Sequence, residues 1–121
     1  MKGGFFVAGD AGLYQRAEAV LLGLGAVKAQ DSDGAVVQLA DPEGRLLTLF
    51  ERAPAGTEWE YDIALPGGPT VVACPFECRW VDLVVRIAGR VADRSALPTW
   101  VLDGDGALWE AGRIDPRAIV L

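Results

Sequence analysis

Two stretches of this chain repeat apolar residues with the period of an α-helix, and the rest alternates short apolar runs with turn residues. Residues 11–24 and 80–91 each place apolar side chains on one face and charged side chains on the other. Asp10 is expected to cap the first helix and Gly25 to end it. The sequence therefore predicts two amphipathic helices, each of which buries one face.

Short strands are predicted around these helices because apolar runs of four to eight residues lie between turn signals. Turn sequences rich in Asp and Gly fill 31–34, 41–44 and 103–106. Pro75 is expected to stop one strand and Pro66 to Pro69 to divide the chain near its middle. The predicted strands are 5–8, 27–30, 35–40, 45–51, 58–65, 70–74, 100–103, 107–110 and 118–121.

This order of elements predicts an α+β fold in which two helices pack on an antiparallel-rich sheet. Each half of the chain can be read as β-α-β-β-β, so a single domain over 1–121 could contain two half-modules, 1–65 and 70–121. The similar turns at 41–44 and 103–106 fall at different places in the two halves. The order of elements therefore allows an internal repeat but does not require one.

Charge and composition exclude several classes of function. Eleven basic residues against seventeen acidic ones give a net charge of −6, which disfavours nucleic acid and anionic membranes as partners. The chain contains no histidine, so triads and dyads that use a histidine base are excluded. Without histidine we also expect no bound metal, and we expect no cofactor.

Apolar runs and cysteine usage suggest a compartment. The run from residue 5 to residue 8 is too short for a signal peptide, and uncharged runs such as 19–27 are shorter than a membrane span. Two cysteines, Cys74 and Cys78, do not make a disulfide framework. We expect a cytoplasmic protein with reduced thiols, and the composition is typical of a GC-rich bacterial genome.

The first half resembles a module of the vicinal oxygen chelate superfamily, which includes glyoxalases and bleomycin-resistance proteins. The resemblance covers residues 5–51 and rests on Phe5-Phe6-Val7, the first helix, the turn 31–34 and the segment 41–51. It implies a βαβββ module and a ligand cleft. In metal-binding members the closing glutamate, here Glu51, is a ligand, but the matching histidine is missing.

Cys74 and Cys78 carry the strongest nucleophiles in the chain. Cys74 falls in an apolar run and is interpreted as core. Cys78 is placed at the start of the second helix beside Arg79, where a helix terminus and a cation would favour thiolate. Burial by Phe76 and Trp80 would instead make it structural, which is the interpretation we favour. No catalytic residue is assigned.

Three carboxylates, Glu58, Glu60 and Asp62, alternate with apolar residues and would form a row on one strand face. Such a row either keeps an edge strand soluble or attracts a basic partner. Trp109 and Glu110 are the further candidates for that surface.

The first functional hypothesis is thus a non-catalytic protein that captures a basic protein partner, as immunity proteins and inhibitors do. The alternative is a small-molecule-binding or sequestering protein similar to vicinal oxygen chelate proteins, which could act through carboxylates. Its candidate ligand residues are Glu51, Cys78 and Glu110. A homodimer completed by an exposed strand is the third reading. A cleft lined by tryptophan and carboxylates would favour the small molecule, and a flat acidic face would favour the protein.

Overall fold

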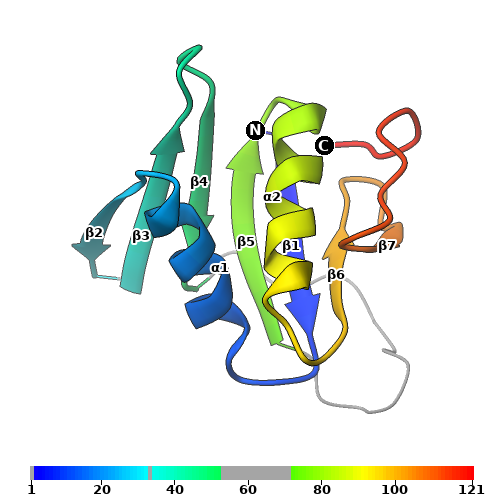
Figure 1. Ribbon diagram of the computed structural model, residues 1–121, viewed down its shortest axis with the longest axis horizontal. Helices are drawn as coiled ribbons and strands as arrows, with labels where there is room; N and C mark the ends of the chain where they lie inside the picture. The colour runs from blue at the N-terminus through cyan, green and yellow to red at the C-terminus, as the bar shows by residue number, and fades with distance from the viewer. Residues whose placement is uncertain (1, 33, 53–71) are drawn as a thin grey trace.

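The computed structural model describes residues 2–32, 34–52 and 72–121, which form seven strands and two helices (Figure 1). Along the chain, the first helix follows the first strand and precedes the second. The second helix lies between the fifth and sixth strands. In chain order the elements are β1 (Gly3–Ala8), α1 (Leu13–Gly23), β2 (Val27–Asp31), β3 (Gly34–Ala40), β4 (Leu46–Phe50), β5 (Val72–Cys78), α2 (Val81–Asp93), β6 (Thr99–Leu102) and β7 (Leu108–Glu110).

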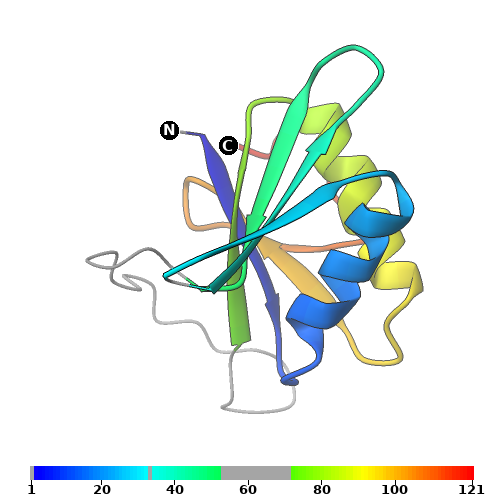
Figure 2. The same cartoon turned by 90° about the vertical axis from the view of Figure 1, so that its left-hand side faces the viewer.

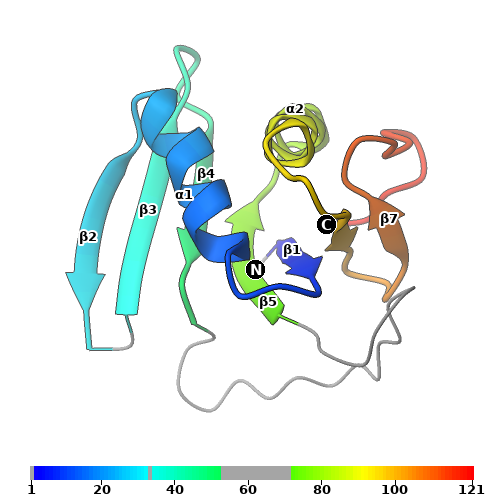
Figure 3. The same ribbon diagram turned by 60° about the horizontal axis from the view of Figure 1, so that its bottom comes forward.

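The described strands form one sheet in the order β2-β3-β4-β5-β1-β6-β7, and every neighbouring pair is antiparallel. Both helices cover the same face of this sheet (Figure 2). α1 packs on β3, β5 and β1, α2 packs on β5 and β6, and the two helices contact each other (Figure 3). The predicted α+β class, with two helices on an antiparallel sheet, is confirmed.

The core lies between the helices and the sheet, and strand alternation builds it. Inward side chains of the central strands are fully or almost fully buried, as in Leu47 and Leu49 of β4 and Phe76 and Cys78 of β5. Their neighbours Thr48 and Glu77 point to the opposite face, which carries no helix. α2 contributes Leu83, Val84, Ile87, Ala88 and Val91 to the core, as the periodicity predicts.

Two hairpin turns, β3–β4 and β6–β7, share one hydrogen-bonding pattern. Oδ1 of Asp41 accepts the N–H groups of Glu43 and Arg45, at 2.9 and 2.8 Å. Oδ1 of Asp103 accepts the N–H groups two and four residues further on, both at 2.9 Å. Each turn places glycine at φ near 80°, a conformation that other residues rarely adopt. The hairpin turn predicted at 103–106 is therefore confirmed.

Although these turns are alike, the two predicted half-modules do not form separate sheets in the described residues. The opening strand β1 pairs with β5 and β6 of the second half, and β4 also pairs with β5. The half-module arrangement stays a prediction.

The prediction that Pro75 ends its strand is wrong, because β5 continues through Pro75 to Cys78. The N–H of Cys78 points toward β1 and donates to the carbonyl of Lys2 at 3.0 Å. Strand alternation then turns the nitrogen of Pro75 toward β4. Pairing with β4 ends at Phe76, so proline removes no hydrogen bond of the described ladder there.

Two further expectations need correction. Residues 118–121 form no strand; instead, the carbonyl of Val120 accepts the N–H of Gly104 at 2.7 Å. Asp10 is not the N-cap of α1, because Gly12 holds that position. Asp10 accepts the N–H of Gly12 and binds the guanidinium of Arg16, at 2.6 Å for the nearest pair, and so braces the approach to the helix.

Candidate functional site

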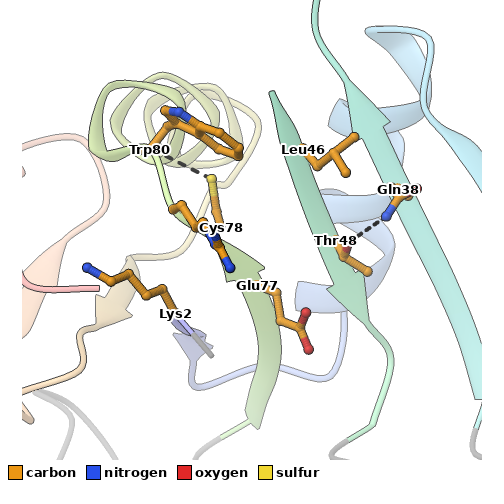
Figure 4. Close-up of a pocket in the computed structure, with 8 residues that line it drawn as sticks. Lys2, Gln38, Leu46, Thr48, Glu77, Cys78 and Trp80 are labelled. Atoms are coloured by element: carbon orange, nitrogen blue, oxygen red, sulfur yellow. Dashed lines mark hydrogen bonds between the residues drawn. The ribbon is translucent and has the colours of Figure 1, made fainter. Parts of the chain in front are cut away.

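A pocket of about 410 Å³ lies where β5 leaves the sheet for α2 (Figure 4). This volume falls in the range of small-molecule sites. β3 and β4 supply Gln38, Leu46 and Thr48. The other lining residues are Lys2 before β1, Glu77 and Cys78 of β5, and Arg79 and Trp80 on the way into α2.

A polar row crosses three strands and forms one wall of this pocket. Thr48 is the register partner of both Gln38 on β3 and Glu77 on β5. The side-chain amide of Gln38 donates to the hydroxyl of Thr48 at 3.0 Å. Each of these three residues stands between buried apolar neighbours on its own strand, so the row faces away from the helices.

The apolar wall comes from Leu46 and Trp80. Leu46, the first residue of β4, is 42% exposed. Trp80 is half-buried, packs against the core and occupies the N-cap of α2 with extended backbone angles. Pairing between β4 and β5 ends at Leu47 and Cys78, and beyond that pair the two backbone segments diverge. This separation leaves room between Leu46 and Trp80, as Figure 4 shows.

Arg45, next to the lining residue Leu46, joins the β3–β4 turn to α2. Its guanidinium binds Asp41 of the β3–β4 turn at 2.7 Å and Asp82 of the first turn of α2. The hydrogen bond from Arg45 lowers the pKa of Asp82. At Asp41 desolvation opposes ionisation, but hydrogen bonds from the backbone and guanidinium of Arg45 outweigh it and lower the pKa. Both carboxylates therefore stay ionised and keep the brace closed at neutral pH.

Three formal charges in the pocket have no ion-pair partner among the described residues: Lys2, Glu77 and Arg79. Arg45 next to the pocket is paired, with Asp41 and Asp82. A charged group that the protein does not neutralise is free to bind a charged group on a ligand. The pocket therefore combines an apolar wall, a hydrogen-bonding row and charges of both signs.

Cys78 lines the pocket but is not the activated thiol that its position beside Arg79 could have produced. It is the last residue of β5 and not the first of α2, and it is 3% exposed. Its thiol donates to the carbonyl of Trp80 at 3.6 Å. Burial raises the pKa of the Cys78 thiol above its usual value. The same cause raises the pKa of Cys74 to about 12, so both cysteines favour the neutral form.

The alternative ligand residues predicted from sequence are not brought together. Glu51 follows β4 at the end opposite to the Leu47–Cys78 pair and lies 4.0 Å from Arg52. Glu110 lies on the edge strand β7, exposed and 3.6 Å from Arg113. Of the three predicted residues, Cys78 alone lines this pocket.

Trp109 is fixed by the hairpin that holds it. It packs partly buried against the core, and its indole N–H donates to Oδ2 of Asp103 at 2.9 Å. Its neighbour Glu110 points to solvent. The predicted acidic row of Glu58, Glu60 and Asp62 lies outside the described residues.

Sequence reasoning missed most of the pocket, although a signal was present. Gln38, Thr48 and Glu77 are the single polar residues within otherwise apolar stretches of β3, β4 and β5. Treating Pro75 as a strand end removed Glu77 from its strand and hid the third member of the row.

Among the residues that the structure describes, no group of three or more histidine, cysteine or carboxylate side chains could hold a metal ion. No described helix combines the length and apolarity that crossing a bilayer requires. In comparisons with known proteins, no family model, no curated protein and no solved structure matches this chain.

Proposed function

We propose that this chain is a non-catalytic binding protein that holds a small polar molecule in the pocket beside β5 and the start of α2. The observation that carries the proposal is the pocket itself, which Trp80 and Leu46 line together with the polar row of Gln38, Thr48 and Glu77. Small-molecule sites typically combine an apolar lining with a few convergent polar groups. A cleft lined by tryptophan and carboxylate is also the feature that favours a small ligand over a protein partner.

Binding without covalent chemistry is supported by the state of Cys78. A thiol attacks as thiolate, and burial keeps Cys78 protonated. Its proton is directed to the carbonyl of Trp80 and not into the open part of the pocket. A cytoplasmic location belongs to the same proposal, because the two cysteines are free and buried.

The proposal can be tested by screening a library of small ring-containing fragments with ¹H–¹⁵N NMR. Hits are expected to shift the amide signals of Thr48, Glu77 and Trp80 together. Leu46→Asp places a charge on the apolar wall and should abolish those shifts. Leu97→Asp is the matched control, because Leu97 is 54% exposed and lines a different hollow.

The proposal is overturned if no fragment perturbs the pocket amides in the parent protein. It is also overturned if Leu46→Asp and Leu97→Asp weaken binding equally. Leu46 is exposed at the surface, so loss of folding is not the expected effect of its replacement.

A further inference from the structure

The charges in the pocket narrow the chemistry of its ligand, an inference that rests on the proposed function. Lys2 and Arg79 offer two cations, and Glu77 offers one anion. None of the three makes an ion pair with a described residue. A ligand with a single charge would leave either the anion or both cations without a partner.

The two cationic side chains and the anionic side chain lie on different segments, so different parts of the pocket would bind an anion and a cation. Arg79 and Lys2 lie on the segments that leave β5 and enter β1. Guanidinium and ammonium groups bind carboxylates strongly, and guanidinium can do so with two hydrogen bonds. Glu77 lies within the strand row beside Thr48, where its carboxylate can accept hydrogen bonds from an ammonium group.

The third part of the pocket is apolar. The indole of Trp80 and the side chain of Leu46 lie where β4 and β5 separate (Figure 4). A planar group packs on an indole face with a large gain in buried area. The pocket therefore has places for a carboxylate, an ammonium group and a ring in one small volume.

We propose that the pocket binds a small zwitterion with a flat apolar side group, the chemistry of a free aromatic amino acid. Arg79 and Lys2 bind its carboxylate, Glu77 binds its ammonium group, and the ring lies against Trp80. The hydroxyl of Thr48 and the amide of Gln38, already bonded to each other, hold the polar row in place beside Glu77.

Three probes with the same ring and chain separate the contributions of the charges: L-phenylalanine, 3-phenylpropionate and phenethylamine. Isothermal titration calorimetry is expected to show phenylalanine binding about tenfold or more tightly than either singly charged probe, since a charge-assisted hydrogen bond contributes on that order. Glu77→Gln should lower the affinity for phenylalanine to that for phenylpropionate. The affinity for phenylpropionate itself should stay the same or increase. Arg79→Gln should weaken the binding of phenylalanine and of phenylpropionate, but not the binding of phenethylamine.

Arg86→Gln is the matched control, because Arg86 lies exposed on α2 and is not a lining residue of the pocket. It should change none of the three affinities. The inference is overturned if phenylpropionate or phenethylamine binds as tightly as phenylalanine, or if Glu77→Gln leaves the order unchanged. It is also overturned if fragments bind the pocket while all three probes fail. In each of these cases the proposed function stands, whereas the absence of any fragment at the pocket refutes both.

Discussion

Arg45 and Asp82 form an ion pair, 2.5 Å from Nη1 to Oδ2, that joins the β3–β4 turn to the first turn of α2. The same guanidinium binds Asp41, which is itself fixed by the backbone of its turn. The pair therefore spans the gap where β4 and β5 separate, next to Leu46 and Trp80 of the pocket. Its expected role is to hold the two walls at a constant distance.

Arg45→Gln should loosen this brace. The exposed pair with Asp82 contributes little to stability, but the Asp41 side chain is only 3% exposed and also loses a charged donor, so the melting temperature should fall. Hydrogen exchange of the amides around Val81 to Leu83 should become faster, and fragment binding at the pocket should weaken. Arg86→Gln, on the helix that carries Asp82, should alter neither the hydrogen exchange nor the fragment binding. Unchanged exchange and unchanged binding in Arg45→Gln would show that the ion pair does not position the pocket.

The helices and hairpins of this fold could be predicted from sequence because their signals are local. The periodicity over 80–91 reproduces α2 to within two residues, and the turn at Asp41 defines its hairpin. The strand order could not be predicted, since β5 pairs with β1 and β4 through contacts far apart in sequence. Pro75 would interrupt its strand only if its nitrogen pointed to a paired neighbouring strand, and this depends on the strand order.

The pocket was unpredictable for the same reason. Gln38 and Thr48 meet through a short hairpin, but Glu77 reaches them only through the pairing of β4 with β5. Lys2 and Trp80 also line the pocket, although they lie far apart in the sequence. The local pattern identified each polar residue as an exception on its strand, and only the register shows that the exceptions form one row.

Asp103 is predicted to be the main source of pH-dependent stability in the β6–β7 hairpin. Desolvation raises its pKa, but hydrogen bonds from Trp109 and the N–H groups of Ala107, Val120 and Asp105 prevail, so the pKa lies below its usual value. A lowered folded pKa stabilises the fold above the unfolded value, 3.8, and this contribution disappears as the pH falls through the folded pKa.

Asp103→Asn should therefore cost about 1–3 kcal/mol of unfolding free energy near neutral pH, because buried N–H groups lose a charged acceptor. Urea unfolding at several pH values should show that this difference narrows below about pH 4. Trp109→Phe, which removes one of the donors, should cost less. A difference that stays constant down to pH 2–3 would contradict the assigned role of the carboxylate.

Gly3 and Gly23 provide a matched pair for the steric requirements of the fold. A Cβ at Gly3 would lie 2.0 Å from the carbonyl oxygen of Phe76, so Gly3→Ala must displace β1 from β5. We expect a loss of about 1–3 kcal/mol. A Cβ at Gly23 meets nothing within 4 Å, and alanine favours helix, so Gly23→Ala should gain up to about 1 kcal/mol. Chemical denaturation of both variants measures these changes, and equal effects would contradict the β1–β5 register.

Both cysteines should react slowly with a thiol reagent in the native protein. Cys74 and Cys78 are 1% and 3% exposed, and burial raises the pKa of each. The thiolate fraction and the access of the reagent are therefore both small. Labelling followed by absorbance at neutral pH should be far slower than that of a free thiol and should become fast in denaturant. Rapid native labelling of Cys78 that a pocket ligand blocks would show an accessible, activated thiol.

Capture of a basic protein, the first functional hypothesis, depends on Glu58, Glu60 and Asp62, which lie outside the described residues. If these carboxylates form a row exposed to solvent, they repel one another and attract a basic partner. Replacing all three by glutamine should leave folding intact or slightly improve it. Association with a partner captured at low salt should become slower and lose much of its salt dependence.

The Leu46→Asp variant separates this hypothesis from the small-molecule proposal, because it changes the pocket and leaves the acidic row intact. A basic partner should bind Leu46→Asp as well as the parent protein and bind the triple glutamine variant more slowly. Surface plasmon resonance over a range of salt concentrations measures both. If the triple variant unfolds, the row is buried or paired within the protein. If it captures its partner at the parental rate at every salt concentration, steering by the row is refuted. Either result leaves the pocket as the functional surface to pursue.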